Sequence, residues 1–266
     1  MLIMNCTKAA TEFFTKTQQG RKKSAVARPT HETLAIPTTQ TNAPAQWHWL
    51  VHAIKVKAKN VLIVMDYQTR FSITLTDLKK GDDGDFLDMF ELHLIVHIHE
   101  LMTRIDTEPQ VIKASIANYR AQQDSRQFYL RGDRSVQSHL NDVAWHFRHH
   151  TSTIGAVPAG VDLISQDVFA NQLLRKRKNE KNYYSPHHEF LHQWLHHYAQ
   201  HSDAQATACI DTLKAKERLE FSKRHPELFA TEYVTQNQDN SQDTTCYQSM
   251  SNVVSLDAFR NKNRKD

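Results

Sequence analysis

The segment 47–78 constrains the fold more than any other part of the chain. It holds three runs that are rich in β-branched and aromatic residues, WHWLVHAIKV, NVLIVMDY and RFSITLTDL. Runs of this composition, separated by short polar stretches, predict β-strands. Because short connections join antiparallel neighbours, we expect a three-stranded meander. His48 and His52 would share one face of its first strand, since side chains alternate along a strand.

Other secondary-structure signals surround this segment. Residues 1–7 alternate weakly and predict a further short strand, with a short helix after it. Apolar residues at helical spacing predict a helix over 86–103, although the alternating run 92–99 is also compatible with a strand. A later helix would be capped by Asp133 or Ser135. The sequence therefore predicts the α+β class, with an antiparallel sheet of three to four strands packed with helices.

Composition divides the 266 residues into three regions. A Gly- and Pro-containing connector after residue 150 predicts the end of an α+β domain over 1–150, within which the Pro- and Thr-rich residues 20–45 form a mobile loop. Beyond the connector, helical patterns predict a helical extension over 161–232. The polar residues 233–266 are typical of a disordered tail.

Cysteine usage and the apolar pattern indicate the compartment. The three cysteines are far apart and form no CxxC pair, which argues against a disulfide framework. The first residues do not resemble a secretion signal, and histidines interrupt the longest apolar stretch. We therefore expect a cytoplasmic protein with no membrane span, whose oligomeric state the sequence leaves open.

Three motifs give the chain a resemblance to a known family. They are the tryptophan-led strand QWHWLVHAIKV, the Thr-Arg-Phe-Ser strand entry, and a helix start with Arg134, Ser135, Val136, Asn141 and Asp142. Through these motifs, residues 1–150 resemble a bacterial domain-of-unknown-function family that is often found on plasmids and other mobile elements. The resemblance implies an uncharacterised accessory protein and no catalytic residues.

Histidine abundance is the most unusual feature of the composition, with 17 residues. His188, Glu189 and His192 form an HExxH motif, in which two histidines bind zinc and the glutamate acts as general base. The candidates for a third zinc ligand are His196, Glu217 and Glu220. Because a histidine-rich chain readily contains this motif by chance, a histidine-rich amphipathic helix with no cofactor is the leading interpretation, and zinc is the alternative.

A second group of histidines lies in the predicted helix 86–103. His93, His97 and Glu100 follow one another at intervals of four and three residues, so they would share one helix face. Such a face is capable of metal or proton chemistry. Apolar neighbours on every side favour structural histidines instead.

Basic residues are the main indication of a binding function. The chain has 33 Lys and Arg against 29 Asp and Glu, a formal net charge of +4. Cations near the predicted helices would contact phosphates, while Tyr183 and Tyr184 would stack on bases. The candidate nucleic-acid-binding residues are Arg131, Arg134, Arg148, Arg175, Lys176, Arg177 and Lys178. A charge run such as 175–178 is also typical of a solvated helix end.

Two classes of function follow from these patterns. The leading hypothesis is a non-enzymatic module that binds nucleic acid or a bacterial protein partner in a mobile-element context. The alternative is a zinc-dependent hydrolase that uses the HExxH at 188–192. The sequence contains no phosphate-binding loop, dinucleotide-binding or serine-hydrolase motif, which weakens those classes.

Overall fold

The computed structural model describes residues 1–29, 46–123, 125–177 and 180–228. The chain divides into two compact units, Met1–Glu217 and Arg218–Asp266. All the strands of the described residues belong to the first unit. Within the described ranges, no helix is long and apolar enough to cross a membrane. The expected tail, 233–266, lies outside the described residues.

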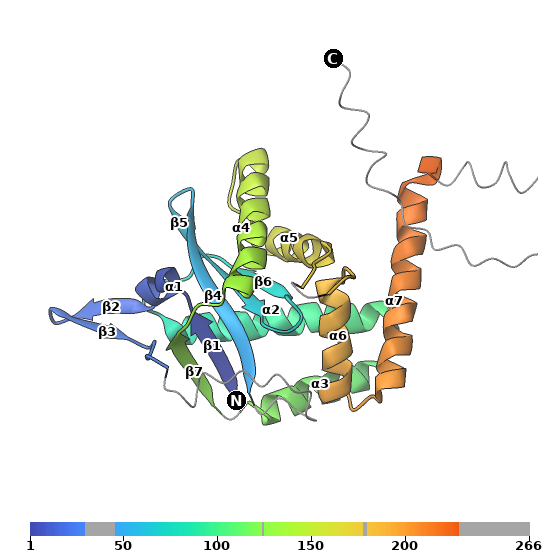
Figure 1. The fold of residues 1–266 in the computed structure, drawn as a ribbon, viewed down its shortest axis with the longest axis horizontal. Coiled ribbons are helices and arrows are strands. Elements are labelled where there is room, and N and C mark those ends of the chain that lie inside the picture. The colour runs from blue at the N-terminus through green and yellow to red at the C-terminus, as the bar shows by residue number, and fades with distance from the viewer. Residues whose placement is uncertain (30–45, 124, 178–179, 229–266) are drawn as a thin grey trace, which may run out of the picture. The chain divides into compact units, whose positions relative to one another are not determined.

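A mixed five-stranded sheet with the order β6-β5-β4-β1-β7 forms the centre of the first unit (Figure 1). The expected meander is confirmed, because β4 (Trp47–Val56), β5 (Lys59–Asp66) and β6 (Ser72–Leu75) pair antiparallel. β1 (Leu2–Cys6) pairs parallel with β4, and β7 (Arg126–Leu130) pairs parallel with β1. The expected antiparallel sheet is thus corrected to a mixed one, since parallel partners far apart in sequence leave no local pattern.

Helices cover both faces of the sheet, which confirms the α+β class. One face packs against α2 (Asp83–Arg104), α3 (Pro109–Ala121) and α6 (Pro186–His197), whose apolar side chains join those of the sheet in one hydrophobic cluster. The other face packs against α4 (Arg134–Ile154) and α5 (Val161–Gln172) in a second cluster. The two strands β4 and β5 therefore contribute apolar side chains to both clusters.

The helix boundaries follow the local sequence signals. Asp133 accepts hydrogen bonds from the amides of Ser135 and Val136, which confirms Asp133 as the cap of α4. α2 is a continuous helix, so the strand alternative for 92–99 is wrong. The short helix expected after β1 is also present as α1 (Lys8–Phe13).

A small hairpin follows α1. β2 (Thr15–Gln18) pairs antiparallel with β3 (Arg21–Ser24), and both turn residues have positive φ, 51° and 74°, as a type I′ turn requires. Part of the expected mobile loop 20–45 is therefore a strand, and its residues 30–45 lie outside the described residues. The sequence RKKS has no apolar alternation because all four residues of β3 are exposed.

The helices after residue 160 take part in the packing of the sheet. Phe190 of α6 stacks on Phe71, with ring centroids 4.1 Å apart. α7 (Asp203–Arg224) adds Leu213 to the same hydrophobic cluster, and the 3-10 helix Pro226–Leu228 follows it. Removing α5 and α6 would therefore expose apolar side chains on both faces of the sheet.

We predict that a chain truncated after Gly155 does not fold cooperatively. The loss of α5 and α6 would expose Phe71 and its buried neighbours to water, and burial of apolar surface is the main stabilising term in folding. Urea unfolding followed by near-ultraviolet circular dichroism would show a sigmoidal transition for the full chain and none for the truncated chain. A chain that ends at Leu228 keeps this packing and is the control. A sigmoidal transition of the short chain would establish residues 1–150 as an independently folding domain.

Candidate functional site

A buried carboxylate organises the turn between β5 and β6. Asp66 is fully buried, and its Oδ1 accepts a hydrogen bond from Trp47 Nε1 at 2.9 Å. Its Oδ2 accepts from the amide and the hydroxyl of Thr69, both at 2.7 Å. Arg70 donates to Ser135 Oγ at the start of α4, at 3.2 Å. The three motifs that carry the family resemblance therefore meet at this turn.

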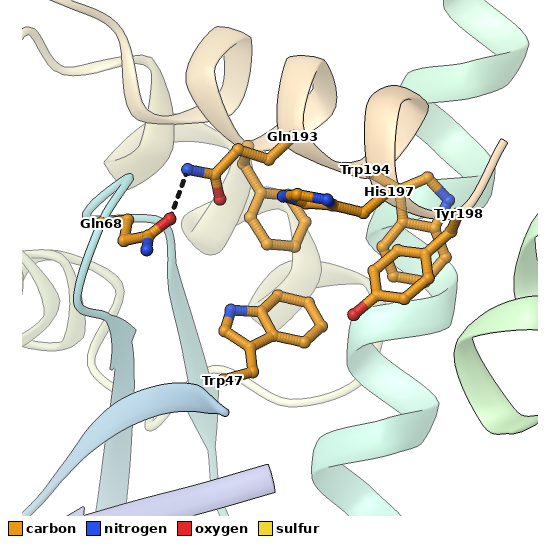
Figure 2. Close-up of a pocket in the computed structure, with 7 residues that line it drawn as sticks. Trp47, Gln68, Gln193, Trp194, His197 and Tyr198 are labelled. Carbon is orange, nitrogen blue, oxygen red and sulfur yellow. Dashed lines mark hydrogen bonds between the residues drawn. The ribbon is translucent and has the colours of Figure 1, made fainter. Parts of the chain in front are cut away.

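A small aromatic cavity lies beside the turn, and Figure 2 shows its side chains. It is lined by Trp47, Gln68, Phe190, Gln193, Trp194, His197 and Tyr198. Its volume is about 10 Å³, room for roughly one water molecule. Gln193 Nε2 already donates to Gln68 Oε1 at 2.8 Å, and Trp194 Nε1 donates to Ser115 Oγ at 3.1 Å. The cavity therefore belongs to the packing of α6 against the sheet.

The basic run after α5 is partly engaged within the fold. Arg175 is only 4% exposed, and its guanidinium lies 3.5 Å from Asp142 Oδ2. The guanidinium of Arg177 packs over the ring of Tyr184, 4.1 Å from its centroid. Lys176 is exposed, and the last residue of the run, Lys178, lies outside the described residues. Lys176 Nζ also lies over the ring of Tyr183, 5.5 Å from its centroid, so all three described residues of the run make contacts within the protein.

The exposed face of α4 gathers the other candidates around an aromatic pair. Trp145 is 59% exposed, and its ring stacks on His149 with centroids 5.4 Å apart and 2° between the planes. Arg134 and Arg148 are exposed on the same helix, and their spacing from Trp145 places all three on one side. Arg131 lies half-buried at the end of β7. We call Arg134, Trp145, Arg148 and His149 the α4 face.

The three residues of the HExxH motif contact different partners. His188 Nε2 lies 2.8 Å from Glu217 Oε2, one of the expected third ligands. His192 Nε2 instead lies 3.3 Å from Asp203 Oδ1. The Glu189 carboxylate lies 3.5 Å from an arginine guanidinium. The structure therefore brings His188 together with Glu217 and does not bring His192 to them.

His187, which the HExxH motif does not include, completes a cluster with His188 and Glu217. Its Nε2 lies 2.8 Å from Glu217 Oε1, and its Nδ1 lies 3.0 Å from the carbonyl oxygen of Asn171. Burial raises the pKa of Glu217, but the hydrogen bonds from the two histidines outweigh it and hold this pKa well below its usual range. Arg104 Nη1 lies 3.3 Å from the same carboxylate. Within the described ranges, this is the one group of three potential metal ligands with mutually close ligand atoms.

The expected face of His93, His97 and Glu100 lies partly in the core. His93 and His97 are buried, and His97 Nε2 lies 3.5 Å from Asp167 Oδ2 on α5. Glu100 borders a cavity of about 10 Å³, and both His97 and His187 line the same cavity. This cavity therefore connects the histidines of α2 with those of α6.

The extent of the family resemblance is wider than the motifs indicate. The model of the domain of unknown function (DUF6933) matches residues 3–189, more than two-thirds of the 266 residues. The chain belongs to this family. The expected domain of unknown function is thus confirmed, and the DUF6933 match continues beyond residue 150 into α6. No curated protein and no solved structure matches the chain.

Burial lowers the pKa of several histidines in the DUF6933 domain. Burial, followed by the nearby charge of Arg131, lowers the pKa of His48 from 6.5 to about 4. Burial also lowers the pKa of His93 and, with the charge of Arg148, that of His52. Because these histidines resist protonation in the folded state, the folded protein binds fewer protons than the unfolded chain between about pH 4 and 6.5.

We predict that the DUF6933 domain loses stability as the pH falls from 6.5 to about 4. Because unfolded His48 binds a proton that folded His48 excludes, acid favours the unfolded chain, and the loss ends below the folded pKa. The free energy of unfolding, measured with urea at successive pH values, would fall less steeply for His48→Gln than for the native chain. Identical pH profiles of the two proteins would contradict this assignment.

Proposed function

We propose that the protein binds single-stranded nucleic acid through the α4 face. The observation that carries this proposal is the exposed Trp145–His149 stack with Arg148 beside it. An aromatic ring accepts any base on its face, and such stacking contributes about 1–3 kcal/mol per base. Guanidinium groups beside the stack supply contacts to phosphates.

The arrangement along α4 fits an extended strand. Arg134 and Arg148 are fourteen residues apart, which corresponds to about 21 Å along a helix, and Trp145 lies between them. Asp142, an acid on α4 that would repel a phosphate, lies 3.5 Å from the buried guanidinium of Arg175, which offsets its charge. Arg175 thus contributes to the proposed surface indirectly, by neutralising an acid.

The biological setting of the proposal comes from the resemblance of the motifs. We infer a cytoplasmic, non-enzymatic accessory protein of a bacterial plasmid or another mobile element, in which access to single strands would accompany transfer or replication of DNA. The remaining basic candidates, Arg131 and Lys176, would add further contacts to phosphates. A protein partner at the α4 face is the competing outcome of the experiment.

The proposal predicts that Trp145→Ala weakens binding of a fluorescein-labelled single-stranded oligonucleotide by roughly 5- to 150-fold, the equivalent of the stacking free energy. Fluorescence anisotropy at low salt measures the affinity. Trp145→Phe keeps an aromatic ring and should retain most of it. Arg148→Ala should reduce the slope of log affinity against log salt concentration by about 1, as expected for the loss of one phosphate contact.

The chain offers two matched controls for this experiment. Lys113 is an exposed cation on α3, against the opposite face of the sheet, so Lys113→Ala should leave the affinity unchanged. Trp47, Trp49 and Trp194 are at most 8% exposed, so quenching of tryptophan emission by the oligonucleotide would report on Trp145. Absence of binding at low salt, or equal affinity of Trp145→Ala and native protein, would refute the proposal and direct attention to a protein partner.

A further inference from the structure

Two neighbouring helices bring three potential metal ligands to one place. Pro186 begins α6, and the next two residues, His187 and His188, direct their Nε2 atoms at the two carboxylate oxygens of Glu217 on α7, each at 2.8 Å. The potential ligand atoms of the three residues all lie within 4.8 Å of one another. A single ion could therefore contact all three side chains.

Neighbouring polar groups orient the ring of His187. Its Nδ1 lies 3.0 Å from the carbonyl oxygen of Asn171 and 2.7 Å from the hydroxyl oxygen of Ser185. The opposite ring nitrogen, Nε2, lies 2.8 Å from Glu217 Oε1. A proton or a metal ion could occupy the space between these two atoms.

His187 is a buried and oriented side chain. It is only 6% exposed, and neighbouring polar groups hold its second ring nitrogen. Metal-bound histidines are oriented in the same way, by polar groups that contact the ring nitrogen that does not bind the metal. We propose that His187, His188 and Glu217 bind a divalent transition-metal ion, with zinc as the best fit.

The donor set and its geometry match zinc. Two imidazole nitrogens and one carboxylate oxygen, with a fourth position left for water, are typical of zinc sites that activate water. Ligands about 2.0–2.1 Å from a tetrahedral ion lie about 3.3 Å apart. The two His–Glu pairs, now at 2.8 Å, would therefore each separate by only about half an ångström. A cavity of about 10 Å³ beside His187, also lined by His97 and Glu100, has room for roughly one water molecule near the proposed site.

Arg104 supports the carboxylate of this site. Its Nη1 lies 3.3 Å from Glu217 Oε1, close enough to orient the carboxylate. A neighbouring cation also lowers the affinity for a second positive charge, so we expect weaker zinc binding than in a site without an arginine.

The proposed site and the HExxH motif share His188 but differ in their other members. The HExxH interpretation requires His192 and Glu189. His192 lies beside Asp203 instead, and Glu189 lies beside Arg177. The proposed site requires His187 and Glu217. Single substitutions therefore separate the two interpretations, and the site is independent of the α4 face.

The test is zinc affinity of the full-length, metal-stripped protein, measured by competition with a chromophoric chelator. We expect His187→Ala and Glu217→Gln each to lower the affinity by at least about tenfold, while His192→Ala and Glu189→Gln leave it unchanged. Circular dichroism and thermal unfolding without metal verify that each variant is folded. Glu217→His replaces one ligand with another and should restore binding that Glu217→Gln loses, which separates ligation from a structural role.

Cobalt provides a second readout that does not depend on activity. Tetrahedral Co²⁺ bound by the native protein should give visible absorption that His187→Ala loses and His192→Ala retains. No zinc binding at micromolar concentrations would show that the cluster is a hydrogen-bonded ion pair only and would overturn the proposal. Loss of binding in His192→Ala with retention in His187→Ala would overturn it in favour of the HExxH site.

Discussion

The buried carboxylate of Asp66 is the interaction on which the arrangement of both helical layers depends. It accepts a hydrogen bond from the indole of Trp47 on β4, and its bonds with Thr69 close the turn that leads into β6. From this turn, Arg70 reaches Ser135 at the start of α4, and Gln68 reaches Gln193 on α6. One buried carboxyl group with satisfied hydrogen bonds thus fixes elements on both faces of the sheet, and the same group without these donors would be costly to bury.

Local patterns in the sequence predicted the elements but not all of their partners. The meander was visible because its strands are apolar and its turns short, and α4 because Asp133 precedes a helical stripe. The parallel position of β1 between β4 and β7 depends on contacts between distant segments. The hairpin of β2 and β3 was missed because its residues are almost all exposed and carry no apolar alternation.

The candidate sites were likewise predicted without all of their contact partners. The run at 175–178 was predicted to bind nucleic acid, with a solvated helix end as the alternative, yet Arg175 pairs through its backbone with Tyr184 and its side chain is buried. Trp145 escaped notice because it lies outside the apolar stripe of α4, and a tryptophan in that place is itself a usable signal of an exposed aromatic surface. The sequence named Glu217 as a candidate metal ligand. It could not show that His187 rather than His192 lies beside Glu217, because that depends on how α6 packs against α7.

The place of β1 in the sheet has a consequence for the order of folding. Both neighbours of this first strand come later in the chain, and the second, β7, ends at Leu130. At translation rates of about 5–20 residues per second, the N-terminal strand would wait on the order of ten seconds for its last partner. Contacts of such long sequence separation also slow refolding. Until β7 forms, one edge of β1, an apolar strand, has no partner, so the nascent chain is most exposed to misassociation in this interval.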